Sequence, residues 1–196
     1  MKGCYGNIRS RRKSAILRTA VLAGFSLGIF LLGLLLFHSG RNLLSVIAAL
    51  GAIPTGLSAV NMILFLKARP LSREAYEAIE RHRGKLLIRY EMEMTSYDRT
   101  WHIGASCVLN KNVCLFTEET DADLNACEKH VREQLSIGGY EDLTVKVFSD
   151  LSQFTARLDQ LEKLRDTMHA DPAAIEAAWQ PGTTQTPAGI LMSISL

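Results

Sequence analysis

The first 69 residues of the chain contain nine lysines and arginines but no aspartate and no glutamate. All twenty acidic residues follow in residues 70–196, beside thirteen basic ones, so the two parts carry formal charges of +9 and −7. The whole-chain charge of +2 hides this asymmetry. Because an acidic surface repels the phosphate backbone, nucleic acid is disfavoured as a partner of the C-terminal part.

Charged residues are also missing from two long apolar runs, 19–37 and 43–66. As helices these runs would be about 28 Å and 36 Å long, against a hydrocarbon core of about 30 Å. We therefore predict a transmembrane α-helical hairpin over 19–66, with residues 38–42 as its loop. Ion sites and proton relays need ionisable residues inside the membrane, so transport is disfavoured and a small oligomeric effector or pore is the least favoured alternative.

Nearly all basic residues of this part lie before the first apolar run or after the second, and not in the loop between them. They occur in a basic arm, residues 1–18, and in a juxtamembrane linker, residues 67–71, whereas the loop contains only Arg41. The positive-inside rule then predicts a multi-pass protein of the inner (plasma) membrane with both termini in the cytoplasm and the loop outside. The lipid bilayer is thus a predicted partner. The predicted topology determinants are Arg9, Arg11, Arg12, Lys13, Arg18, Lys67 and Arg69.

Small residues recur at helical spacing in both runs. Gly24 and Gly28 form a GxxxG pattern in the first run, and Ala52 and Gly56 belong to a stripe in the second. Such residues let helix backbones approach closely, which predicts packing within the hairpin or, alternatively, against a second copy or another membrane protein. Pro54 lacks an amide proton and predicts a bend in the second helix.

Cysteine is scarce, with four in the chain and no CxxC pair. In a cytoplasmic domain they are predicted to be reduced thiols. A tight turn after residue 109 would place Cys107 opposite Cys114 on neighbouring strands. His102 lies five residues before Cys107, so strict alternation puts the two on opposite faces. No metal site, cofactor or catalytic residue is therefore predicted.

Residues 72–196 alternate between helical and strand periodicities. We predict a cytoplasmic α+β domain with a mainly antiparallel sheet of about four strands and flanking helices. The expected elements are a helix from Ser72 to about Arg83, strands at 86–94, 101–109, 112–118 and 143–148, helices opened by Thr120, by Ser149 or Asp150 and by Asp171, and an apolar end, 190–196, that adds an edge strand or packs under the domain.

The element order over residues 72–148 resembles the core of restriction-endonuclease-like nucleases. That resemblance would imply an acidic residue on the second strand and Glu-x-Lys on the third, together holding a divalent metal. Here the strand 101–109 has no acidic residue, and the third strand ends in Glu118-Glu119 without the lysine. No GxSxG, P-loop or dinucleotide-binding glycine pattern occurs either.

These patterns together favour a membrane-anchored, non-catalytic interaction or regulatory module that presents an acidic α+β domain at the cytoplasmic face. The predicted partner is another protein, or a second copy, bound through the hairpin or through the domain. The alternative is a membrane-tethered enzyme with a nuclease-like or hydrolase-like domain. The two classes differ in what they need: an enzyme needs converging polar groups in a cavity, and an interaction module needs exposed apolar surface.

Overall fold

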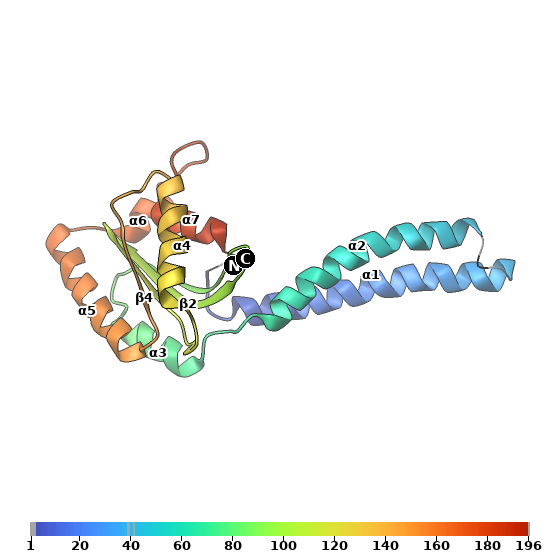
Figure 1. Cartoon of the computed structure of the whole chain (residues 1–196), viewed down its shortest axis with the longest axis horizontal. Helices are drawn as coiled ribbons and strands as arrows, with labels where there is room; N and C mark the ends of the chain where they lie inside the picture. Colours follow the sequence, from blue (N-terminus) through green and yellow to red (C-terminus); the bar gives the residue numbers. More distant parts are fainter. Residues whose placement is uncertain (1–2, 39, 41, 196) are drawn as a thin grey trace. The chain divides into compact units, whose positions relative to one another are not determined.

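The chain folds into two compact units in a computed structural model that describes residues 3–38, 40 and 42–195. One unit is helical and covers residues 8–68, and the other joins residues 1–7 to residues 69–196. Figure 1 shows two long helices in the first unit and a sheet with helices in the second.

The helical unit consists of α1 (Asn7–Phe37) and α2 (Leu43–Lys67). Both helices are long and apolar enough to cross a membrane, and only 6% and 11% of their most apolar stretches are buried within the protein. The predicted apolar runs are thus helical, and α1 also takes in most of the predicted basic arm. Asn42 caps α2 by accepting the amide of Ser45 at 2.8 Å, whereas residues 39 and 41 of the predicted loop lie outside the described residues.

Polar and small residues form the contact between the two helices. The Thr19 and Ser58 hydroxyls are 2.8 Å apart, and the Ser26 hydroxyl donates to the carbonyl of Ala48 at 2.7 Å. Gly33 approaches α2 so closely that an added Cβ would lie 2.8 Å from the Cβ of Leu44. Thr19, Ser26 and Gly33 are seven residues apart, which is nearly two full turns, and so they share one face of α1.

The small residues predicted to pack within the hairpin lie outside the contact between α1 and α2. A Cβ added to Gly24, Gly28 or Gly56 would meet nothing within 4 Å, and Ala52 is exposed. Gly24 and Gly28 are each two residues from Ser26, about 200° around the helix, so the face that meets α2 excludes them. Packing of these residues within the hairpin is therefore wrong, and their contact with a further membrane helix stays a prediction.

The helix α2 continues without a break through Pro54. The proline leaves the carbonyl four residues before it without its usual helical donor. The residue after the proline, Thr55, donates its hydroxyl to the carbonyl of Gly51 at 2.9 Å. The bend predicted at Pro54 stays a prediction.

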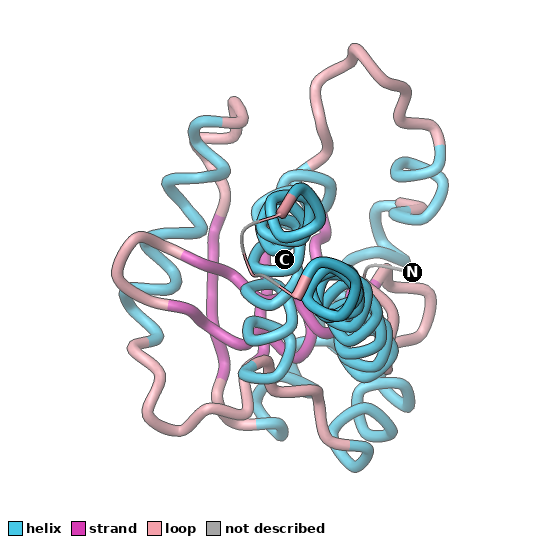
Figure 2. The backbone as a smooth tube through the Cα atoms, turned by 90° about the vertical axis from the view of Figure 1, so that its right-hand side faces the viewer, coloured by secondary structure: helices cyan, strands magenta, loops and turns pink. Residues whose placement is uncertain are grey.

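The second unit is an α+β unit that surrounds one four-stranded sheet (Figure 2). The strand order is β1-β2-β3-β4, with antiparallel pairs from β1 to β3 and a parallel pair between β3 and β4. The sheet is therefore mixed, and the predicted mainly antiparallel sheet is wrong: the crossover through α4 returns the chain in the direction of β3. The elements are α3 (Arg73–His82), β1 (Ile88–Thr95), β2 (Thr100–Leu109), β3 (Asn112–Phe116), α4 (Leu124–Ile137), β4 (Thr144–Phe148), α5 (Leu151–Met168), α6 (Pro172–Ala177) and α7 (Pro187–Ile194).

Two apolar cores cover the two faces of the sheet. The α5 core joins Phe154, Leu158 and Leu161 of α5 to residues of α3 and of the first three strands. The α4 core joins residues of α4, α7 and all four strands, including Val131 and Leu191. Full burial of a large apolar side chain contributes about 1.5–3 kcal/mol, so the two cores supply most of the stability of the unit.

The helices of the α+β unit begin at capping side chains, two of them at places other than those predicted. Asp150 and Asp171 cap α5 and α6 as predicted, but α4 is capped by Asp123 instead of Thr120. Of the two alternatives for the apolar end, packing under the domain is confirmed and an edge strand is not: Thr186 caps a helix, α7, whose Ile190 and Leu191 belong to the α4 core. Among the described residues of this end, Ser195 pairs with the sheet, opposite Met94.

The first described residues of the chain pack on the α+β unit. The carbonyl of Gly3 accepts the amide of Tyr90 at 2.9 Å. The ring of Tyr5 stacks on that of Tyr76, with centroids 4.0 Å apart. Residues 3–7 are therefore a part of this unit, although the sequence predicted a basic arm separate from the domain.

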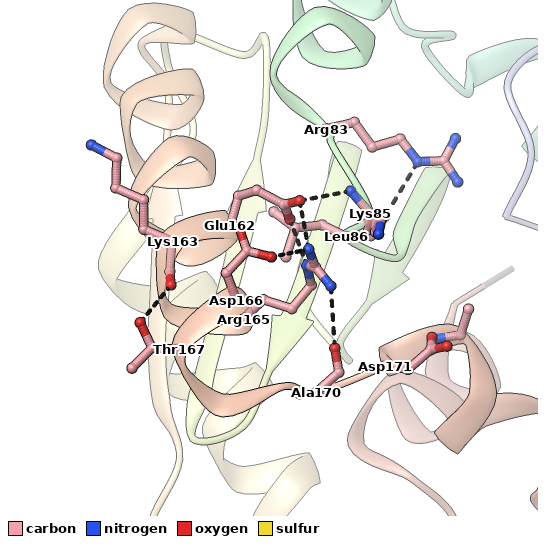
Figure 3. Close-up of polar contacts among 11 residues, drawn as sticks. Arg83, Lys85, Leu86, Glu162, Lys163, Arg165, Asp166, Thr167, Ala170 and Asp171 are labelled. Carbon is pink, nitrogen blue, oxygen red and sulfur yellow. Dashed lines mark hydrogen bonds and ion pairs between the residues drawn. The ribbon is translucent and has the colours of Figure 1, made fainter.

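A charged network fastens the C-terminal half of α5 to the turn before β1 (Figure 3). The carboxylate of Glu162 accepts the amide of Lys85 at 3.0 Å and pairs with Arg165 at 3.0 Å. Arg165 also donates to the carbonyl of Ala170. Gly84 in this turn has φ +51° and lies against Glu162, where an added Cβ would come within 2.5 Å of the carboxylate. The turn therefore depends on glycine for both conformation and space.

Candidate functional site: a buried histidine between two carboxylates

The alternation of side chains reverses midway along β1 and β2. Tyr90 faces the α5 core but Met92 faces the α4 core, and β2 reverses in the same way at Gly104. Between them Glu91 has φ +53°, which is rare for a residue with a side chain. A Cβ added to Gly104 would lie 2.5 Å from a Leu71 methyl group, so Leu71 occupies the space above this glycine.

This reversal turns Glu93 and His102 towards the side of the sheet on which Leu71 lies. The two residues are register partners on β1 and β2. Glu93 is 4% exposed, and one of its carboxylate oxygens forms an ion pair with Nδ1 of His102. Nε2 of His102 is 3.6 Å from Glu119, which in turn is 3.7 Å from Arg69. We call Glu93, His102, Glu119 and Arg69 the histidine cluster.

The histidine cluster favours the charged form of its imidazole. Contact with the Glu93 carboxylate is the main cause that raises the pKa of His102, and Glu119 acts in the same direction. Burial and the charge of Arg69 oppose this shift. Each ring nitrogen faces a carboxylate rather than the hydroxyl or thiol of a nucleophile. The cluster therefore resembles a structural ion-pair chain more than the base of a hydrolase.

Two adjoining cavities border the histidine cluster and share Arg69, Glu118 and Glu119. The smaller, about 210 Å³, reaches His102, Leu71 and Gly104. The larger, about 370 Å³, is lined by polar side chains from the start of β2 and the segment before α4. Glu118 accepts the amide of Ser72 at 2.9 Å, which holds the start of α3 at this polar cleft.

The chemistry of a metal enzyme is not assembled in this cleft. The described residues contain no group of three or more His, Cys, Asp or Glu side chains arranged to hold a metal ion. The acidic residue and Glu-x-Lys motif of the nuclease-like pattern are missing from the sequence of β2 and β3. The agreement with that pattern is limited to the order of helices and strands.

The cysteines of the α+β core are unreactive thiols. Cys107 lies opposite Cys114 as predicted, and burial raises the pKa of both. Burial also raises the pKa of Cys127 to about 12. His102 and Cys107 lie on the same side of the sheet, so their predicted separation onto opposite faces is wrong, because the alternation reverses at Gly104. Only the thiolate is nucleophilic, so none of these thiols is activated.

The predicted topology determinants lie near the start of α1 and the end of α2, the ends of the two helices that the loop does not connect. Arg9, Arg11, Arg12, Lys13 and Arg18 belong to α1, and Lys67 ends α2, whereas Arg69 belongs to the histidine cluster. Arg12 donates to the carbonyl of Leu66, and Arg18 donates to the hydroxyl of Ser58 at 3.2 Å. Cations at a helix C-terminus donate hydrogen bonds to its last carbonyls and interact favourably with the negative end of its dipole. Arg41 lies outside the described residues.

An apolar groove lies between α6, α7 and the ends of β2 and α5. Its volume is about 300 Å³. It continues into a second cavity, about 430 Å³, with which it shares Asn110, Tyr140 and Pro187. We call the pair the α6–α7 groove. Met168 and Ile175 line it and are 44% and 60% exposed, so its apolar walls reach the surface.

Sequence reasoning missed both the histidine cluster and the α6–α7 groove. The acidic residues inside the apolar strand 86–94 are a signal for the cluster, since buried carboxylates require a partner. Which residue becomes the partner, here His102, depends on the register of β1 and β2 and on the reversal at Gly104. Comparison of the chain with protein-family models, with curated proteins and with solved structures finds no match in any of the three.

Proposed function

We propose that the protein is a membrane-anchored, non-catalytic module that holds an acidic α+β unit at the cytoplasmic face of the inner (plasma) membrane, where it binds or regulates another protein. The observation that carries the proposal is the pair of long helices whose apolar side chains are exposed along their length. Exposed apolar area of this extent is unfavourable in water and favourable in a bilayer.

The charge distribution supports the proposed topology. Five basic residues of α1 precede its apolar stretch, and Lys67 follows that of α2, so both helices have their cations at the ends that the chain joins to the α+β unit. The positive-inside rule places these ends in the cytoplasm. The main part of the α+β unit, from Arg69 onwards, then follows on the same side.

The chemistry of the α+β unit supports a role in binding. Its buried thiols have raised pKa values, and its half-buried His102 faces two carboxylates. Its exposed apolar side chains include Ile175 in the α6–α7 groove. Exposed apolar surface bordered by charge is typical of a protein-binding surface.

The topology is tested by labelling two single cysteines with a membrane-impermeant maleimide. Cys4 is exposed and belongs to the α+β unit, and a Gly40→Cys variant places a thiol in the loop between the helices. In intact cells the loop cysteine should react at once and Cys4 only after the membrane is opened. Labelling of Cys4 in intact cells, or release of the protein by alkaline carbonate, would refute the proposal.

A further inference from the structure

We propose that the α6–α7 groove binds an amphipathic helical segment of a partner protein, one that presents apolar side chains to the groove and lysine or arginine to its rim. This inference rests on the proposed binding function and names the kind of partner. It concerns a surface separate from the histidine cluster and from the helices α1 and α2.

The floor of the groove is apolar and preformed. Leu109 is 3% exposed and belongs to the α5 core, and Pro172 is buried at the start of α6. Tyr140 donates its hydroxyl to the carbonyl of Gln185 at 3.0 Å, which fixes one wall. Asp171 caps α6 by accepting the amide of Ala173 at 3.1 Å, which fixes the other. A rigid groove binds with a small entropy loss.

The shape of the groove favours a helix over a small molecule. Ile175 and Met168 line it, yet more than two fifths of each residue faces solvent. A small apolar ligand on the floor would leave these side chains exposed to water. A helix laid across the groove covers them while its anchors at i, i+3 and i+4 reach the floor, which is the usual mode of helix-in-groove recognition.

The charge of the rim favours a basic occupant. The ionisable residues that line the groove are three carboxylates, Glu141, Asp142 and Glu176, and one lysine, Lys111. Lys111 is 3.5 Å from Asp142, so these two charges match each other and Glu141 and Glu176 remain as the excess negative charge of the rim. Residues 70–196 as a whole carry a charge of −7, which attracts a basic partner at long range.

The inference is tested by selection from a library of helical peptides against the full chain in nanodiscs. The library has leucine at i, i+3, i+4 and i+7 and random residues on the other face. We expect the selected peptides to be enriched in lysine and arginine. Replacing those cations by glutamate should weaken binding at least about tenfold, since several charge contacts are lost together.

Two matched variants locate the binding site. Ile175→Lys places a charge in the groove and should weaken the selected peptides at least about tenfold, as expected for a central anchor. Ile137→Lys makes the same change at the end of α4, where Ile137 is 80% exposed and does not line the groove, and should leave binding within about twofold. Both positions are exposed, so both variants should fold.

Four outcomes would overturn the inference. They are a selection without binders, selected peptides without a basic excess, equal binding to the Ile175→Lys variant, and displacement of the peptides by oleate, which would make the groove a site for small apolar molecules. None of these outcomes changes the maleimide result at Cys4 and Gly40→Cys. Failure of this inference is therefore distinguishable from failure of the proposed topology.

Discussion

Replacing His102 by glutamine removes the positive charge that faces Glu93 in the interior of the α+β unit. Glu93 is 4% exposed, so its carboxylate would lose its cation without gaining water. Removal of one partner from a buried ion pair costs about 3–5 kcal/mol. The side chain of His102 is 17% exposed, which allows some solvent screening and favours the lower limit, about 3 kcal/mol.

This loss should be visible as a lower melting temperature. For a unit of this size 1 kcal/mol corresponds to about 4 °C, so His102→Gln should melt about 12 °C below the wild type. The double variant Glu93→Gln/His102→Gln has no buried charge at this place and should recover a part of the loss. Recovery separates the electrostatic cost from a general failure of packing.

The same pair predicts how stability depends on pH. Because Glu93 raises the pKa of His102 in the folded state, the folded protein binds this proton more tightly than the unfolded protein. The stabilisation is complete below about pH 6.5, the unperturbed histidine value, and is lost as the pH rises through the folded-state pKa. The His102→Gln variant should lack this component of the pH dependence.

The measurement is thermal unfolding of the full chain in detergent between about pH 6 and pH 9, a window around the unperturbed histidine value. Trp101 is buried and its fluorescence reports on the core of the α+β unit. Because the ring of Trp101 stacks on that of His130 with centroids 5.4 Å apart, the His130→Gln variant is the control for an effect of this second ring on the fluorescence. Equal pH dependence in wild type and His102→Gln, or equal melting temperatures at pH 6, would refute the electrostatic argument.

Three further predictions follow from packing and burial. Gly104→Ala should lower the stability of the unit by about 1–3 kcal/mol, measured by thermal unfolding, because the new methyl overlaps a Leu71 methyl; an unchanged melting temperature would contradict this. Gly84→Ala should destabilise by at least about 1 kcal/mol in the same measurement, since the turn requires φ +51° and the new methyl meets the Glu162 carboxylate; Gly84→Asn, which tolerates this conformation but brings the same Cβ, should not recover the loss. A thiol reagent should modify Cys4 quickly and Cys107 only on unfolding, which mass spectrometry of the labelled protein resolves.

Local rules account for much of this fold. The absence of charge over 19–37 and 43–66 predicts two long helices, because a run of that length must be helical in a bilayer. The caps at Ser72 and Asp150 follow from side chains that accept amides of the first helical turn. The pairing of Cys107 with Cys114 follows from a two-residue turn, which determines the register of a hairpin.

The residues predicted to pack within the hairpin show where local rules end. The period of α1 predicts that Gly24 and Gly28 share a face, and it cannot say which face meets α2. Thr19 and Ser26 gain hydrogen bonds to Ser58 and Ala48 at that contact, so their face packs inward. The apolar end 190–196 shows the same limit, because a short apolar run has no period that separates strand from helix.

The sequence by itself thus determined the two long apolar helices, the charge division, most of the caps and the order of helices and strands up to α6, since each depends on residues within a few positions of one another. Tertiary structure alone decided the parallel placement of β4 and the reversal of faces at Glu91 and Gly104. Both depend on contacts between segments far apart in the chain, such as Leu71 seated on Gly104. The histidine cluster and the α6–α7 groove are completed only by such contacts, so a local pattern could indicate a buried carboxylate in the strand 86–94 but not its partner, and could not indicate the groove.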